Sequence, residues 1–283
     1  MRDDGTAILM EKLADGSMGS TLRLFMDSSG CGALLATNKT GRLGWFVIFG
    51  DGRRIAVPTK SLIAWLQNPF AQAPICRRLF ATADGPLLQV TVFSSDASFS
   101  HHAISLQEMY PPQRASKWMI GDIAAVDSGE RPAIAVRVLH DPCPGMTCVY
   151  VIPAGRVGDP VLRTPPTALK PQDVKHALSR DGRHLLLCQG TAAVCYAIGQ
   201  DALVERWRLQ ASGPIRHALP CGLADFAFRT GGEVRAVRGG DGETLYSLCD
   251  FELFGRPFAL SDDGRWLVHE DLTVRRFIGS DGK

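Results

Sequence analysis

The feature that most constrains the fold of this chain is a strand–turn–strand unit that recurs in its C-terminal part. Residues 176–187 read HALSRDGRHLLL, residues 226–237 read FAFRTGGEVRAV, and residues 258–269 read FALSDDGRWLVH. In each unit a polar turn containing glycine separates two apolar strands. The turn glycines of the first and third units, Gly182 and Gly264, are separated by two periods of about 41 residues. Such a period indicates repeats of one small sheet and disfavours a sandwich or a barrel.

Strand-like patterns also occupy the N-terminal part of the chain. Leu43–Phe49 and Arg54–Val57 flank Gly50-Asp51-Gly52, and Asp-Gly tolerates the positive φ values that tight hairpin turns need. One helix-like pattern, Thr59–Asn68, predicts a short helix near 59–68. Alternating or β-branched runs predict further strands at Thr21–Met26, Leu87–Phe93, Ala133–Leu139 and Cys148–Ile152.

Short strands, frequent glycine turns and the repeat period together predict an all-β fold. The expected architecture is a β-propeller of about six to seven four-stranded blades, degenerate in the N-terminal half, with the short helix near 59–68. Blade strands alternate their side chains, so Arg265 and Trp266 are expected on the more exposed side. The residues expected to be buried between blades are Leu185, Leu187, Leu267 and Val274.

Two domain organisations remain open from the sequence. In the first, residues 1–283 form a single propeller, and the strand Thr21–Met26 pairs with the last blade to close it, because an unpaired edge invites aggregation. In the second, residues 1–160 form a separate β domain and residues 171–283 form the repeated blades. The Pro-rich stretch Pro160–Pro171 is then the boundary, because clustered prolines disfavour strand ladders and stiffen linkers.

The last repeated unit resembles a WD40 repeat. In that family a Ser-x-Asp-Gly turn joins the first two strands, and an Asp-x-Thr-Val turn precedes the third strand. Phe277 stands where the family usually has the final Trp. By this resemblance Asp271 accepts hydrogen bonds in the turn before the third strand. The residues that match the turn motifs are Ser179, Asp181 and Gly182 in the first unit and Ser261, Asp263, Gly264 and Asp271 in the last.

Composition and motifs argue against several functional classes. The net charge of +2 is too small to indicate a nucleic-acid partner. No run of 18 or more apolar residues predicts a membrane helix, and the acidic N-terminus lacks the features of a secretory signal, so a cytoplasmic location is expected. None of the eight cysteines forms a CxxC pair. The pair His101-His102 is predicted to lie in a surface loop. The sequence contains no nucleophile, phosphate-loop or metal motif, so no catalytic, metal-binding or cofactor-binding residue is predicted.

These features predict a non-catalytic scaffold that presents a propeller surface to a protein partner, because function in repeat folds lies in exposed loops and grooves. The alternative is a propeller hydrolase similar to lactonases, with a metal in the central channel. The repeats are similar in style to bacterial WD40-like proteins. Some of these are associated with a MoxR-type AAA ATPase and a von Willebrand A-domain protein, so that resemblance implies a partner of one of these kinds.

Overall fold

The fold is given by a computed structural model. It describes every residue of the ranges 161–170 and 173–249, and outside these ranges it describes only the strands. The chain divides into two compact units, Met1–Pro111 and Pro112–Lys283. The first unit contains β1 (Met18–Met26), β2 (Gly32–Asn38), β3 (Leu43–Ile48), β4 (Arg54–Val57), β5 (Leu79–Asp84), β6 (Leu87–Phe93) and β7 (Phe99–Ser105).

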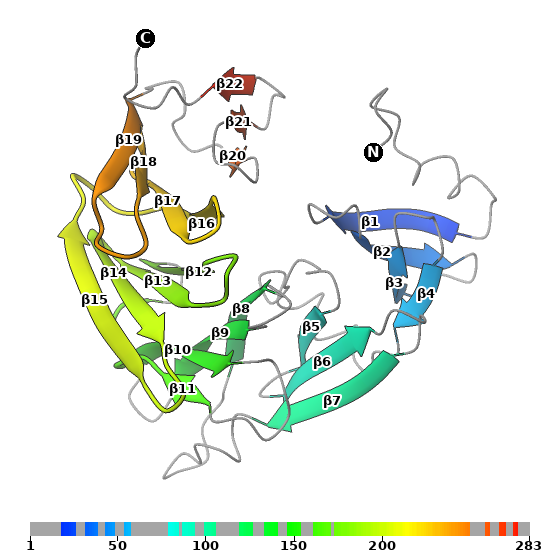
Figure 1. Ribbon diagram of the computed structural model, residues 1–283. Coiled ribbons are helices and arrows are strands. Elements are labelled where there is room, and N and C mark those ends of the chain that lie inside the picture. Colours follow the sequence, from blue (N-terminus) through cyan, green and yellow to red (C-terminus); the bar gives the residue numbers. More distant parts are fainter. Residues whose placement is uncertain are drawn as a thin grey trace. The chain divides into compact units, whose positions relative to one another are not determined.

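The second unit contains the strands from β8 to β22 (Figure 1). They are β8 (Met119–Val126), β9 (Ala133–His140), β10 (Met146–Pro153), β11 (Leu162–Arg163), β12 (Val174–Leu178), β13 (His184–Gln189), β14 (Ala192–Ile198), β15 (Leu203–Gln210), β16 (His217–Cys221), β17 (Asp225–Arg229), β18 (Glu233–Val237), β19 (Thr244–Cys249), β20 (Phe258–Leu260), β21 (Trp266–His269) and β22 (Val274–Arg276).

Every sheet in the described residues is an antiparallel meander, in which neighbours along the chain pair with each other. Four sheets have four strands, β1–β4, β8–β11, β12–β15 and β16–β19, and two have three, β5–β7 and β20–β22. The predicted hairpin around Asp51 is confirmed, since Ile48 of β3 is paired with Arg54 of β4. The predicted helix at Thr59–Asn68 lies outside the described residues.

Thr21–Met26, which were predicted to pair with the last blade, are paired within their own sheet. These residues belong to β1, which pairs with β2 from Met18 opposite Asn38 to Met26 opposite Gly32. In the last sheet, β22 pairs with β21. A hairpin to the next strand closes a short loop, and short loops cost less conformational entropy than long ones. This local pairing uses one edge of β1, which stands at the end of its sheet, and its pairing with the last blade stays a prediction.

The Pro-rich stretch Pro160–Pro171 is not free of ladder contacts, as was expected of a linker. Its β11 pairs with β10, with Leu162 opposite Val151 and Arg163 opposite Tyr150. Farther on, Thr147 and Thr167 exchange backbone hydrogen bonds of 2.7 and 2.8 Å. The described part of this stretch thus belongs to the sheet β8–β11. The choice between one propeller and two domains stays a prediction.

Within the second unit, neighbouring sheets pack through their first strands. β12 contacts both β8 and β9 on one side and β16 on the other. As a result β13 is buried on both faces, and Leu185 and Leu187 are at most 1% exposed, as predicted. The burial of Leu267 and Val274 lies outside the described side chains. The cluster that joins sheets β12–β15 and β16–β19 comprises Ala177, Leu186, Cys188, Ala193, Cys195, Trp207, Ile215, Phe226, Phe228 and Val237.

Polar side chains also tie β9 to β12. Nη1 of the buried Arg137 donates a hydrogen bond to the backbone carbonyl of Val174. Nε2 of His176 lies 3.3 Å from the carbonyl oxygen of Ala135. Each strand thus offers a side chain to the backbone of the other. Buried polar groups need such partners to offset their lost hydration, so this pairing favours one alignment of the two sheets.

Candidate functional site

The predicted turn residues of the first repeat lie between β12 and β13. Oγ of Ser179 donates to Oδ1 of Asp181 at 2.5 Å and accepts from the backbone N–H of His184 at 2.9 Å. Oδ1 of Asp181 also accepts from the backbone N–H of Arg183 at 3.0 Å. Gly182 has a φ of 69°, in the left-handed region that glycine occupies without strain. Ser261, Asp263, Gly264 and Asp271 lie outside the described residues.

Although this turn brings Ser, Asp and His together, its geometry is structural. The Ser179 side chain is completely buried, and its hydroxyl proton goes directly to Asp181. In a nucleophile site the histidine takes that proton instead. Burial lowers the pKa of His184, and the charge of Asp181 only partly opposes this effect. The backbone N–H of Asp181 donates to the carbonyl of Leu223 at 3.0 Å, so the turn also anchors the following sheet.

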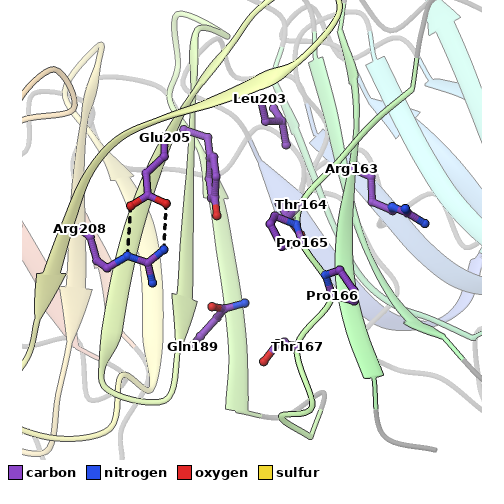
Figure 2. Close-up of a pocket in the computed structure, with 10 residues that line it drawn as sticks. Arg163, Thr164, Pro165, Pro166, Thr167, Gln189, Leu203, Glu205 and Arg208 are labelled. Carbon is purple, nitrogen blue, oxygen red and sulfur yellow. Dashed lines mark hydrogen bonds and ion pairs between the residues drawn. The ribbon is translucent and has the colours of Figure 1, made fainter. Parts of the chain in front are cut away.

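A pocket of about 600 Å³ lies between the end of β11 and the sheet β12–β15 (Figure 2). On one side stand Thr164 and the two prolines that follow it, and on the opposite side Glu205 and Arg208. Gln189 and Thr167 face each other toward one end, while the side chain of Arg163 points away. The pocket is lined by Arg163, Thr164, Pro165, Pro166, Thr167, Gln189, Tyr196, Leu203, Glu205 and Arg208.

The shortness of β11 explains why this pocket exists. Pro165 and Pro166 have no backbone N–H, so they cannot extend the ladder with β10. The chain is held on either side of the prolines, where the N–H of Thr164 donates to the carbonyl of Val149 at 2.9 Å and Thr167 pairs with Thr147. A two-residue outer strand covers little of the neighbouring sheet. Part of the face of β14 and β15 therefore stays open.

The charged groups of the pocket neutralise each other. Nε and Nη2 of Arg208 donate to the two carboxylate oxygens of Glu205 at 3.1 and 2.8 Å. This hydrogen bonding lowers the pKa of Glu205 and raises that of Arg208. Both side chains are about half exposed, so the pair contributes little to stability. It presents unused N–H donors and acceptor lone pairs on one rigid, bidentate unit.

Tyr196 supplies a largely buried polar side chain to the pocket. It is 6% exposed, and burial, followed by the charge of Glu205, raises its pKa. The hydroxyl thus stays protonated at neutral pH and can both donate and accept. In the part of the chain that the structure describes, it has no hydrogen-bond partner. Tyr196 lines the pocket, so its hydroxyl is placed to bond with a ligand there.

Two solved structures show the same architecture at low sequence identity. Hsv2 from Kluyveromyces lactis is 13% identical, with a TM-score of 0.54 over 89% of this chain and 78% of that one. The Dos1 propeller is 10% identical, with a TM-score of 0.51 over 88% of this chain. The chain has a β-propeller fold. The match spans 64% of the Dos1 propeller chain, so this chain corresponds to less than two thirds of that one. No protein-family model and no curated protein matches the sequence.

Sequence reasoning missed the pocket of this propeller. None of its polar lining residues, among them Gln189, Tyr196 and Arg208, was singled out from the sequence. The available signal was the Pro165-Pro166 pair, which marks where an outer strand must stop. A proline pair does not show which face of the neighbouring sheet it uncovers, because that depends on how the two blades pack.

The described residues hold no candidate for two further kinds of site. Among these residues, no three His, Cys, Asp or Glu side chains are grouped as a metal site requires. Nor does the described part of the chain contain a helix long and apolar enough to cross a membrane.

Proposed function

We propose that this propeller is a non-catalytic scaffold that binds a partner protein, and that the pocket beside β11 is one of its contact sites. The observation that carries the proposal is a pocket of about 600 Å³, within the range of sites that enclose a ligand group. Its walls combine Leu203 and two prolines with a few fixed polar groups, the usual composition of a recognition site.

The chemistry of the pocket favours binding over catalysis. Glu205 has a lowered pKa because both its oxygens accept from Arg208, which makes it a weak base. Tyr196 has a raised pKa because it is buried, so it is a poor proton donor in acid catalysis. General acids and bases work best with a pKa near the operating pH. These two residues are instead suited to hold a partner by hydrogen bonds.

The proposal includes the partners and location expected from the sequence. A cytoplasmic AAA ATPase or a von Willebrand A-domain protein is the partner class to test first. Repeat folds present broad surfaces, of which one pocket forms only a part, so the partner is expected to contact neighbouring loops as well.

The test is capture of partners on the full chain from the native host, followed by direct titration of the purified pair. Arg208→Ala should weaken the purified complex, because it removes one side of the pocket. Arg238→Ala is the matched control, since Arg238 is also about half exposed and pairs with two acids, Asp241 and Glu243, in the β18–β19 turn. A complex weakened equally by both variants would remove the pocket from the contact surface. Turnover of a small substrate by the purified chain would overturn the scaffold function.

A further inference from the structure

The pocket beside β11 carries an inference about the chemistry of what it binds, which rests on the proposed function. We infer that it takes an uncharged peptide segment of the partner and recognises it through backbone amide groups. The juxtaposition behind this inference is a tyrosine hydroxyl, a glutamine amide and a bidentate Arg–Glu pair around one cavity.

The first step is charge. Glu205 and Arg208 satisfy each other in a bidentate pair, and Arg163 points away from the other lining residues (Figure 2). A charged side chain entering the pocket would meet a like charge beside each opposite one. It would lose hydration without a net Coulombic gain, and that loss is costly. A neutral ligand group has no such penalty.

The second step is the balance of donors and acceptors. Tyr196 and Gln189 can each donate and accept, Arg208 has N–H groups left over, and the carboxylate oxygens of Glu205 have further lone pairs. A peptide unit carries one N–H donor and one C=O acceptor, and both must be satisfied when they are buried. The pocket offers matched partners for both groups. A ligand with acceptors alone, such as a phosphate, would leave the acceptors of the pocket unmatched.

The third step is how the segment is held. The outer edge of the sheet β8–β11 ends in Pro165 and Pro166, which cannot donate to an added strand. Recognition by strand addition at this edge is therefore disfavoured. The side chains of β13, β14 and β15 have to supply the hydrogen bonds, while Leu203 and the prolines pack against the segment's aliphatic side chains.

The experiment is selection of random peptides on the full chain, followed by titration of synthetic capped versions. Tyr196→Phe and Gln189→Leu each remove hydrogen-bonding groups while keeping most of the side-chain volume. Each should weaken binding about three- to tenfold, the effect of losing a neutral hydrogen bond of typical strength. Arg238→Ala should leave the affinity unchanged. Between about 50 and about 500 mM salt the affinity should change less than about twofold, because screening acts on charges.

The alternative outcomes separate this inference from the proposed function. Selected peptides that carry charge and lose affinity more than about tenfold over the same salt range would overturn the uncharged ligand and leave the scaffold standing. Peptides that bind the wild type and both pocket variants equally would overturn this pocket as the peptide site. If the purified partner binds but no peptide is selected, the segment-recognition inference falls while the scaffold function stands.

Discussion

Trp207 shows at the scale of single residues how one side chain joins two blades. It lies on β15, and its Nε1–H donates to the carbonyl of Gly239, in the turn before β19, at 2.9 Å. Sγ of Cys195 lies 3.4 Å from the same carbonyl. Gly242 closes this turn against the indole with a φ of 78°. The glycine-dense segment around Asp241 forms the turn between the paired strands β18 and β19.

Replacement of Gly242 by Ala should destabilise the fold. A methyl group there would lie 2.8 Å from Cδ2 of Trp207, and the positive φ strains any residue with a Cβ. We expect a loss of about 1–3 kcal/mol in the free energy of unfolding, measured by urea denaturation. Gly240→Ala is the control, because nothing lies within 4 Å of a methyl group at that position. Equal losses for the two variants would contradict this account of the turn.

His217 makes stability depend on pH. Burial lowers its pKa to about 4, and the charges of Arg229 and Lys175 act in the same direction. The unfolded chain, with a pKa of about 6.5, then binds the proton more tightly than the folded one. The contribution to stability is therefore present above about pH 6.5 and is lost as the pH falls toward 4. His217→Gln should reduce the loss of stability between pH 7 and pH 5.

His184, whose pKa burial also lowers, acts in the same direction, so the His217 variant should not abolish the dependence. Titration of the His217 ring signals by NMR provides the direct measurement. A midpoint near 6.5 in the folded chain would contradict the burial effect.

Strands β13 and β15 show at the scale of elements how position within a blade sets burial. Central strand β13 lies between two neighbouring sheets, and residues 185–188 are all buried. The outer strand β15 has only Trp207 buried. The sequence of β13 is a continuous apolar run, which is typical of strands covered on both faces. Three of the eight residues of β15 are charged, Glu205, Arg206 and Arg208, and charged side chains protect an outer edge against unwanted pairing.

Alanine substitutions should reproduce this contrast. Leu185→Ala and Leu186→Ala should each cost about 2–5 kcal/mol, although the two side chains point to opposite faces of β13. Val204→Ala on β15 should cost less than about 1 kcal/mol, since Val204 is 53% exposed. Thermal or urea unfolding measures all three. A small effect from one of the two leucine variants alone would mean that one face of β13 is not core.

The comparison of the two strands also shows what the sequence could predict. Local patterns located β3, β4, β6 and β9 nearly to the residue, because strand alternation and Asp-Gly turns are short-range signals. The turn at Ser179 was foreseen from its motif. The partner of β1, the ladder contacts of the Pro-rich stretch and the pocket were not. These features depend on which sheets meet, and a single sequence does not encode that in any local pattern.

At the scale of the whole molecule, the sheets of the second unit depend on their neighbours. Sheet β12–β15 buries one face against β16–β19 through the cluster that contains Trp207 and Phe228. Its first strand, β12, contacts β8 and β9, with Arg137 and His176 bonded to backbone carbonyls across that boundary. A blade with one of these neighbours removed would expose apolar side chains and leave buried polar groups without partners.

The two domain organisations predicted from the sequence can be separated by cutting the chain at Pro171. A fragment of residues 171–283 lacks β8–β11, so it should expose the face of β13 that carries Leu185 and Leu187. We expect it to be insoluble, or to bind a hydrophobic dye and melt without cooperativity. Coexpression with residues 1–170, which restore β8–β11, should rescue a soluble, cooperatively melting complex. The control is the uncut chain under the same conditions. If the 171–283 fragment alone is soluble and melts cooperatively, the single propeller is excluded and a domain boundary within Pro160–Pro171 stands. The reason is that only a set of blades with its own complete core can unfold in one transition.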